Sequence, residues 1–106
     1  MPRKTYPIDE AKVAVLAYIR ESTRRELRRC LEPTVWEGFH WCYSALHLSV
    51  RMPDGEPLGD GRIKAAALAL MDDGLFVWAG KSGWRLSPVE MDVLRAELQE
   101  AADARP

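Results

Sequence analysis

The chain has 106 residues, of which 47% are hydrophobic and 29% charged, a composition that predicts one small globular domain with a modest core. No apolar run approaches the ~20 residues that a membrane span needs, and residues 1–7 lack the apolar region of a signal peptide. Cys30 and Cys42 are the only cysteines, so without an export signal we expect free thiols and a cytoplasmic protein.

Charge is unevenly distributed although the net charge is only −1. Residues 1–31 carry eight Lys or Arg against four Asp or Glu, a balance of +4, and residues 61–86 carry four against two, a balance of +2. Residues 32–60 and 87–106 are acidic, at −4 and −3. A basic face on a near-neutral domain is compatible with a nucleic-acid partner, and solvated faces of mixed sign fit equally well.

The first predicted elements are an extended arm and an apolar helix. Residues 1–7 contain two prolines and two basic residues, which favour an arm of the kind that can enter a nucleic-acid groove. A helix follows, with Asp9 as its N-cap. Its run from Val13 to Ile19 is apolar nearly all round, so it is central to the core or shared with a partner subunit.

A second, short helix is predicted from the capping box Thr23 to Glu26. Its exposed face concentrates positive charge, because i and i+4 positions stack on a helix. Four arginines on such a face can contact several phosphates or be paired to nearby glutamates, and the four are Arg24, Arg25, Arg28 and Arg29.

Pro33 ends that helix, and the capping box Thr34 to Glu37 predicts a third helix to about residue 48. Its apolar stripe comprises Trp36, Phe39, Tyr43, Leu46 and Val50. Residues 46–52 also alternate with strand periodicity, so both interpretations stay open there. Trp41 points off the stripe and is a candidate interface residue.

Residues 53–61 predict a loop, after which Asp60 caps a helix from Gly61. The buried stripe of this helix is expected to be Ile63, Ala66, Ala67, Leu70 and Met71. Gly74 then ends it as a left-handed residue. Two short apolar runs around Gly80–Gly83 predict a hairpin, with Lys81 at its tip and Arg85 facing outward.

The last helix is predicted from a cap at Ser87, with Pro88 at its first position and Glu90 closing the capping box, to about Ala102. Its apolar residues form a seam that packs on the core or pairs with a second copy, namely Met91, Leu94, Leu98 and Ala101. Residues 103–106 are expected to fray, so the domain spans residues 8–102.

The sequence lacks the patterns of common chemistry. Gly80-Lys81-Ser82 does not have the spacing of a phosphate-binding loop. His40, Cys42 and His47 do not share a helix face as zinc ligands would, so we expect no metal and no cofactor. No nucleophile elbow occurs, and a Cys42–His47 pair has no third partner, so we expect no enzyme.

Residues 61–94 carry a helix ending in Gly74-Leu75-Phe76, a turn at Gly80–Gly83 and the entry Leu86-Ser87-Pro88 into a last helix. This order resembles the winged helix-turn-helix superfamily, in particular bacterial regulators of the MarR and PadR kind. The resemblance implies a mainly α, α+β domain of about five helices and a two-stranded wing. It implies DNA contacts by Arg62 and Lys64 in the major groove and by Lys81 and Arg85 on the wing.

Two departures weigh on that resemblance. The connection from Met52 to Asp60 is longer than the short turn of the family, and the helix before the wing is rich in alanine and offers few side chains, such as Asn or Gln, that read base edges. We therefore hold two hypotheses. One is a DNA-binding regulator, dimeric through its first and last helices, and the other is a winged-helix module or small inhibitor that binds a protein through exposed tryptophans.

Overall fold

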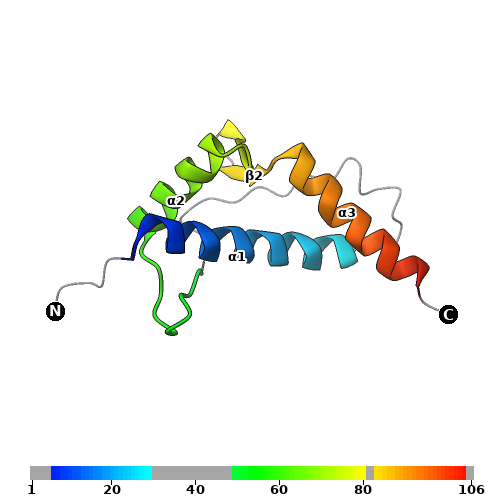
Figure 1. Cartoon of the computed structure of the whole chain (residues 1–106), viewed down its shortest axis with the longest axis horizontal. Helices are drawn as coiled ribbons and strands as arrows, with labels where there is room; N and C mark the ends of the chain where they lie inside the picture. The colour runs from blue at the N-terminus through cyan, green and yellow to red at the C-terminus, as the bar shows by residue number, and fades with distance from the viewer. Residues whose placement is uncertain (1–5, 30–48, 81–82, 105–106) are drawn as a thin grey trace.

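The computed structural model describes residues 6–29, 49–80 and 83–104, which form three helices and one antiparallel two-stranded sheet. The elements are α1 (Ile8–Arg29), α2 (Asp60–Asp72), β1 (Phe76–Trp78), β2 (Trp84–Leu86) and α3 (Pro88–Asp103). Figure 1 shows α2 against the first half of α1 and α3 against its second half, with the hairpin between them. The mainly helical α+β class is confirmed, but the described part of the chain does not bear out five helices.

One continuous helix, α1, replaces the two that the sequence predicts before Pro33. Its buried residues recur every four positions and are Ala11, Val15, Ile19, Thr23 and Leu27. The predicted helix start at Thr23 is wrong, because this threonine is 1% exposed on the buried stripe and the helix continues through it. The arginine-rich stretch therefore occupies the last turns of a long helix.

The start of α1 also differs from the prediction. The Pro7 carbonyl accepts the Ala11 N–H at 3.1 Å, so α1 begins at Ile8 and Asp9 lies in its first turn instead of capping it. Tyr6, in the predicted arm, is buried, and its hydroxyl donates to the Asp54 carboxylate at 2.8 Å. The last residue of the predicted arm before Pro7 thus belongs to the core, while residues 1–5 lie outside the described chain.

Residues 49–59 form a tight, hydrogen-bonded loop. The Leu58 N–H donates to the Val50 carbonyl at 2.9 Å, and the Met52 N–H donates to the Glu56 carbonyl at the same distance. Gly55 allows the reversal between them with a φ of +87°. The strand alternation therefore holds for residues 49–52, where Val50 and Met52 are buried and Arg51 is exposed. The predicted helix 34–48, with Trp36 and Trp41, lies outside the described residues.

α2 begins at Asp60, and its N-cap is Gly59, which makes no side-chain cap hydrogen bond. The predicted cap at Asp60 is wrong because this residue has already entered the helix. The predicted stripe is buried at Ile63, Ala66, Ala67 and Leu70, whereas Met71 is half-buried. At the other end Gly74 has the predicted positive φ, +78°.

A Schellman motif closes α2 and turns the chain into the hairpin. The Leu75 N–H donates to the Leu70 carbonyl at 2.9 Å, and the Gly74 N–H donates to the Met71 carbonyl at 3.0 Å. A further contact fixes this end of α2, since Lys12 of α1 forms an ion pair with Asp73. The Asp73 carboxylate raises the pKa of Lys12, first by hydrogen bonding and then by charge, with Asp9 adding to the effect.

The hairpin has the predicted two strands, with Phe76 opposite Leu86 and Trp78 opposite Trp84. One face of the hairpin belongs to the core, because Phe76, Trp84 and Leu86 are buried. Trp78 stays 55% exposed and packs against Trp84 in a T-shaped arrangement, with ring centroids 5.6 Å apart. Lys81 at the tip lies outside the described residues.

α3 starts as predicted, because the Ser87 hydroxyl accepts the Glu90 N–H and Pro88 occupies the first turn. The predicted return bond of the capping box does not form: the Ser87 N–H donates instead to the Leu75 carbonyl at 2.9 Å, and the Glu90 carboxylate binds Arg20. The apolar residues Met91, Leu94 and Leu98 are buried in this one chain, which fits packing on the core, and Ala101 is exposed.

Candidate protein-binding groove

The four arginines at the end of α1 divide between two sides of the helix. Arg24 lies toward α3, where its Nε is 3.2 Å from the Glu97 carboxylate and its Nη1 is 3.5 Å from that of Glu21. Arg28 extends to the same Glu21, at 3.9 Å. Arg24 and Arg28 are thus joined to acidic groups of the same domain.

On the other side of α1, Arg29 pairs with Glu26 at 3.3 Å and remains 74% exposed at its side chain. Arg25 forms no ion pair with any residue that the structure describes and is exposed. Among the residues that the structure describes, Arg25 is thus the one guanidinium of these four without a carboxylate partner.

The basic residues of α2 and the hairpin that are predicted to contact DNA lie in different environments. The Arg62 Nε donates to the Tyr6 carbonyl at 2.8 Å and so holds the start of the chain. Lys64 is exposed on α2, whereas Arg85 is half-buried opposite Val77 in the hairpin.

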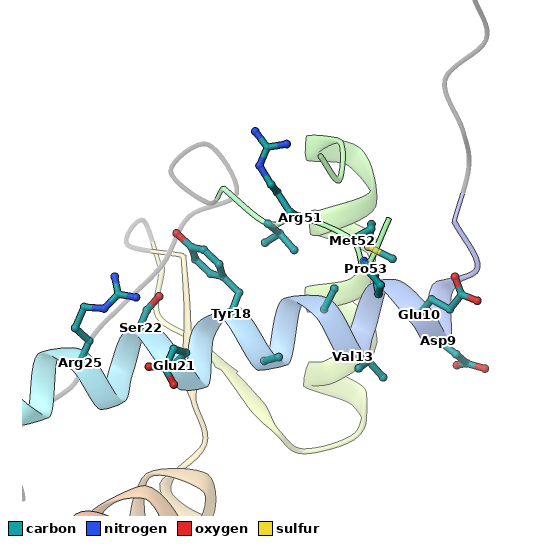
Figure 2. A pocket seen from close by; sticks show the side chains of 13 residues that line it. Asp9, Glu10, Val13, Tyr18, Glu21, Ser22, Arg25, Arg51, Met52 and Pro53 are labelled. Carbon is teal, nitrogen blue, oxygen red and sulfur yellow. The ribbon is translucent and has the colours of Figure 1, made fainter. Parts of the chain in front are cut away.

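A groove of about 790 Å³ runs along the face of α1 that neither α2 nor α3 covers, and we call it the α1 groove. Residues 50–53 form its second wall (Figure 2). Its lining residues are Asp9, Glu10, Val13, Ala14, Ala17, Tyr18, Glu21, Ser22, Arg25, Val50, Arg51, Met52 and Pro53.

The middle of the α1 groove is apolar and accessible. Val13 is 70% exposed and Ala17 is exposed, while Ala14 and Tyr18 are half-buried. Small residues at 14 and 17 keep the helix surface low between the larger side chains, which leaves room for another side chain to enter. The arrangement can therefore bind an apolar stripe.

One end of the α1 groove is acidic, and the other carries Arg25 together with Glu21, whose carboxylate is 3.5 Å from the Arg24 Nη1 and 3.9 Å from the Arg28 Nη1. Figure 2 shows Asp9 and Glu10 beyond Val13 at one end, and Arg25 beyond Tyr18 and Ser22 at the other. Arg51 rises from the opposite wall, where its Nη1 donates to the Gly55 carbonyl at 2.8 Å. The polar rim can thus give charge selectivity to a site whose floor is apolar.

The α1 groove was not predicted as a site from the sequence. Its one signal is the run from Val13 to Ile19, which is apolar on more faces than a core of this size can cover. The second wall, residues 50–53, is far from α1 in the sequence, so only the folded chain brings the two together.

Comparisons with protein-family models, with curated proteins and with solved structures find no match for this chain. In the described ranges no three His, Cys, Asp or Glu side chains gather as metal ligands would. None of the described helices is both long and apolar enough to cross a membrane.

Proposed function

We propose that this chain is a protein-binding module that holds an amphipathic helix of a partner in the α1 groove. The observation that carries the proposal is the accessible apolar floor, in which Val13 is 70% exposed beside the small Ala14 and Ala17. Helix-in-groove recognition uses such a surface, because the apolar residues of the bound helix recur on one face and enter the groove together. Burial of Val13 and its neighbours would supply the apolar part of the affinity.

The charged residues also favour a protein over DNA. Phosphates would have to displace the carboxylates of Glu21 and Glu97 from Arg24, and Arg62 is engaged with the Tyr6 carbonyl. A protein partner requires no such rearrangement, since the net charge of −1 provides little general attraction for a polyanion.

The test is a titration of the isotopically labelled protein with a designed helical peptide of about 18 residues, or five turns, that has one leucine stripe. We expect amide shifts to concentrate on Val13, Ala14, Ala17 and Tyr18. Val13→Asp should weaken binding at least about tenfold, because a carboxylate would have to be desolvated in the groove. The matched control is Val89→Asp, since Val89 is 73% exposed on α3 and does not line the groove.

Two results would overturn the proposal. One is a set of shifts that avoids the α1 groove, or equal losses of affinity in the two valine variants. The other is a set of nuclear Overhauser contacts between the Ala17 methyl and Trp36, Phe39 or Tyr43 in the free protein, which would mean that the chain itself fills the groove.

DNA binding by a winged-helix domain is the second candidate, and the order α2, β1, β2, α3 favours it. In this alternative Lys64, exposed on α2, and Arg85 on β2 would contact the duplex. It predicts an affinity for duplex DNA that falls steeply with salt and that Lys64→Ala and Arg85→Ala reduce together. Salt-independent or undetectable binding would exclude it.

A further inference from the structure

We propose that the charges along the α1 groove fix the direction of the bound helix. This inference rests on the proposed function of the groove. The partner would be a helix with Asp or Glu in its first turns and Lys or Arg in its last turns, lying antiparallel to α1. Its acidic end would meet Arg25, its middle would pass Arg51, which Figure 2 shows between Tyr18 and Val13, and its basic end would meet Asp9 and Glu10.

The positive part of the rim is available for a partner's carboxylates. Arg20, Arg24, Arg28 and Arg29 of α1 each have a carboxylate within 4.0 Å, but within the described residues Arg25 has none. Arg51 likewise forms no ion pair there, and its one hydrogen bond goes to the neutral carbonyl of Gly55. Both guanidinium groups border the groove.

The negative part of the rim is similarly available. Asp9 and Glu10 are exposed in the first turn of α1, and neither forms an ion pair with another described residue. They stabilise α1 itself by lying near the positive end of its dipole. That role leaves their outward oxygens free to accept from a Lys or Arg of the partner.

The dimensions fit one helix of several turns. Asp9 and Arg25 are separated by sixteen positions of one straight helix, so the oppositely charged ends lie about 24 Å apart. In the antiparallel arrangement the dipoles of α1 and its partner lie side by side and point in opposite directions. This attraction between the dipoles adds to that between the charges. A helix with acidic first turns and basic last turns is, in addition, the type that is stable by itself.

The test uses two helical peptides of about 18 residues with identical composition and the same leucine stripe. One has Glu in its first two turns and Lys in its last two, and the other has these reversed. At low salt we expect the first to bind antiparallel to α1 and the second parallel to it, because only these orientations bring the Glu residues of each peptide to Arg25 and its Lys residues to Asp9 and Glu10. A spin label at the C-terminus should therefore broaden the amide signals of Asp9 and Glu10 with the first peptide and that of Arg25 with the second.

Substitutions in the protein separate the effect of the rim charges from any difference in helix stability between the two peptides. The double substitution Arg25→Glu and Arg51→Glu should abolish the fixed orientations or reverse them, and both positions are exposed, so we expect the fold to be retained. The matched control is Arg29→Glu, which reverses an exposed arginine of α1 outside the groove and should preserve both orientations.

The outcomes distinguish the two proposals. The same orientation for the two peptides, or orientations that persist in the double variant, overturns the direction while leaving the groove as a binding site. Binding of neither peptide to the wild-type protein removes the proposed function, and with it the inference that rests on it.

Discussion

The guanidinium of Arg20 binds the carboxylate of Glu90 through two hydrogen bonds, from Nε at 3.1 Å and from Nη2 at 2.7 Å. This paired contact joins the middle of α1 to the first turn of α3 across 70 positions of sequence. The Glu90 side chain is 11% exposed and that of Arg20 36%, so the pair is partly desolvated. Such two-point geometry is stronger and more directional than a surface ion pair.

The first prediction is that Arg20→Ala destabilises the protein by about 2 kcal/mol, because the nearly buried Glu90 carboxylate loses both donors. Urea unfolding followed by circular dichroism measures this loss. The matched control is Arg29→Ala, which removes an exposed pair within α1 and should change stability by less than about 0.5 kcal/mol. Equal effects of the two substitutions would contradict a special role for the Arg20–Glu90 contact.

Glu90 also shows how far sequence patterns can predict this fold. The Ser87 cap and the left-handed Gly74 were predicted correctly, because they depend on a few neighbouring residues. The second half of the capping box failed, since the Ser87 N–H has a distant partner in Leu75 and Glu90 has one in Arg20. The local sequence allowed Glu90 to bond either to the Ser87 N–H or to a distant partner. Contacts with Leu75 and Arg20 in the folded chain determined which of the two forms.

The same reasoning applies to α1 and to the candidate site. Thr23 starts a good capping pattern, but it also continues the four-residue spacing of Val15 and Ile19. Because that stripe is buried, the helix continues through Thr23 and no new helix begins there. The sequence could not show that Glu97 of α3 would lie beside Arg24 of the predicted basic face. For the same reason, it could not place residues 50–53 beside α1 to form the groove.

The second prediction concerns pH and the ion pair of Lys12 with Asp73. The carboxylate raises the pKa of Lys12 in the folded state above the ordinary lysine value of 10.5, so the pair contributes fully below that value. That contribution is lost as the pH rises through the higher folded pKa. We expect wild-type protein to be more stable than Asp73→Asn at pH 7, with a difference that shrinks above about pH 10.

Urea midpoints between neutral and alkaline pH measure that difference, and comparing variants cancels the titration of tyrosines common to both. The control is Asp72→Asn, because the exposed Asp72 is adjacent and has no ion pair within the described ranges. A difference between wild type and Asp73→Asn that stays constant to pH 11 or widens would contradict the assignment.

The third prediction compares Gly61, in the first turn of α2, with Gly74, which follows the C-terminal end of α2. Gly74 has a φ of +78°, and a Cβ built there meets nothing within 4 Å, so Gly74→Ala should destabilise by about 1 kcal/mol through backbone strain alone. Gly61 is also open to a Cβ but lies inside the helix with no positive φ, so Gly61→Ala should stabilise by about 0.5–1 kcal/mol. Thermal unfolding measures both, and shifts of the same sign would contradict this account.

The fourth prediction connects the start of the chain to the second wall of the α1 groove. Tyr6 donates to the Asp54 carboxylate at 2.8 Å, and the same carboxylate accepts the Glu56 N–H at 3.0 Å. Tyr6→Phe keeps the buried ring and removes only the hydroxyl, so we expect a loss of about 1 kcal/mol. The loop that follows Pro53 should then open more often.

Hydrogen exchange makes that opening visible, because the Met52 N–H donates to the Glu56 carbonyl and the Gly55 N–H donates to the Met52 carbonyl. Both amides should exchange faster in Tyr6→Phe, while the amide of Leu94, buried in α3, changes only by the global loss of stability. Unchanged protection of Met52 and Gly55 would show that the loop holds its shape without the tyrosine. Faster exchange would show that the hydroxyl of Tyr6 stabilises the wall against which a bound helix must pack.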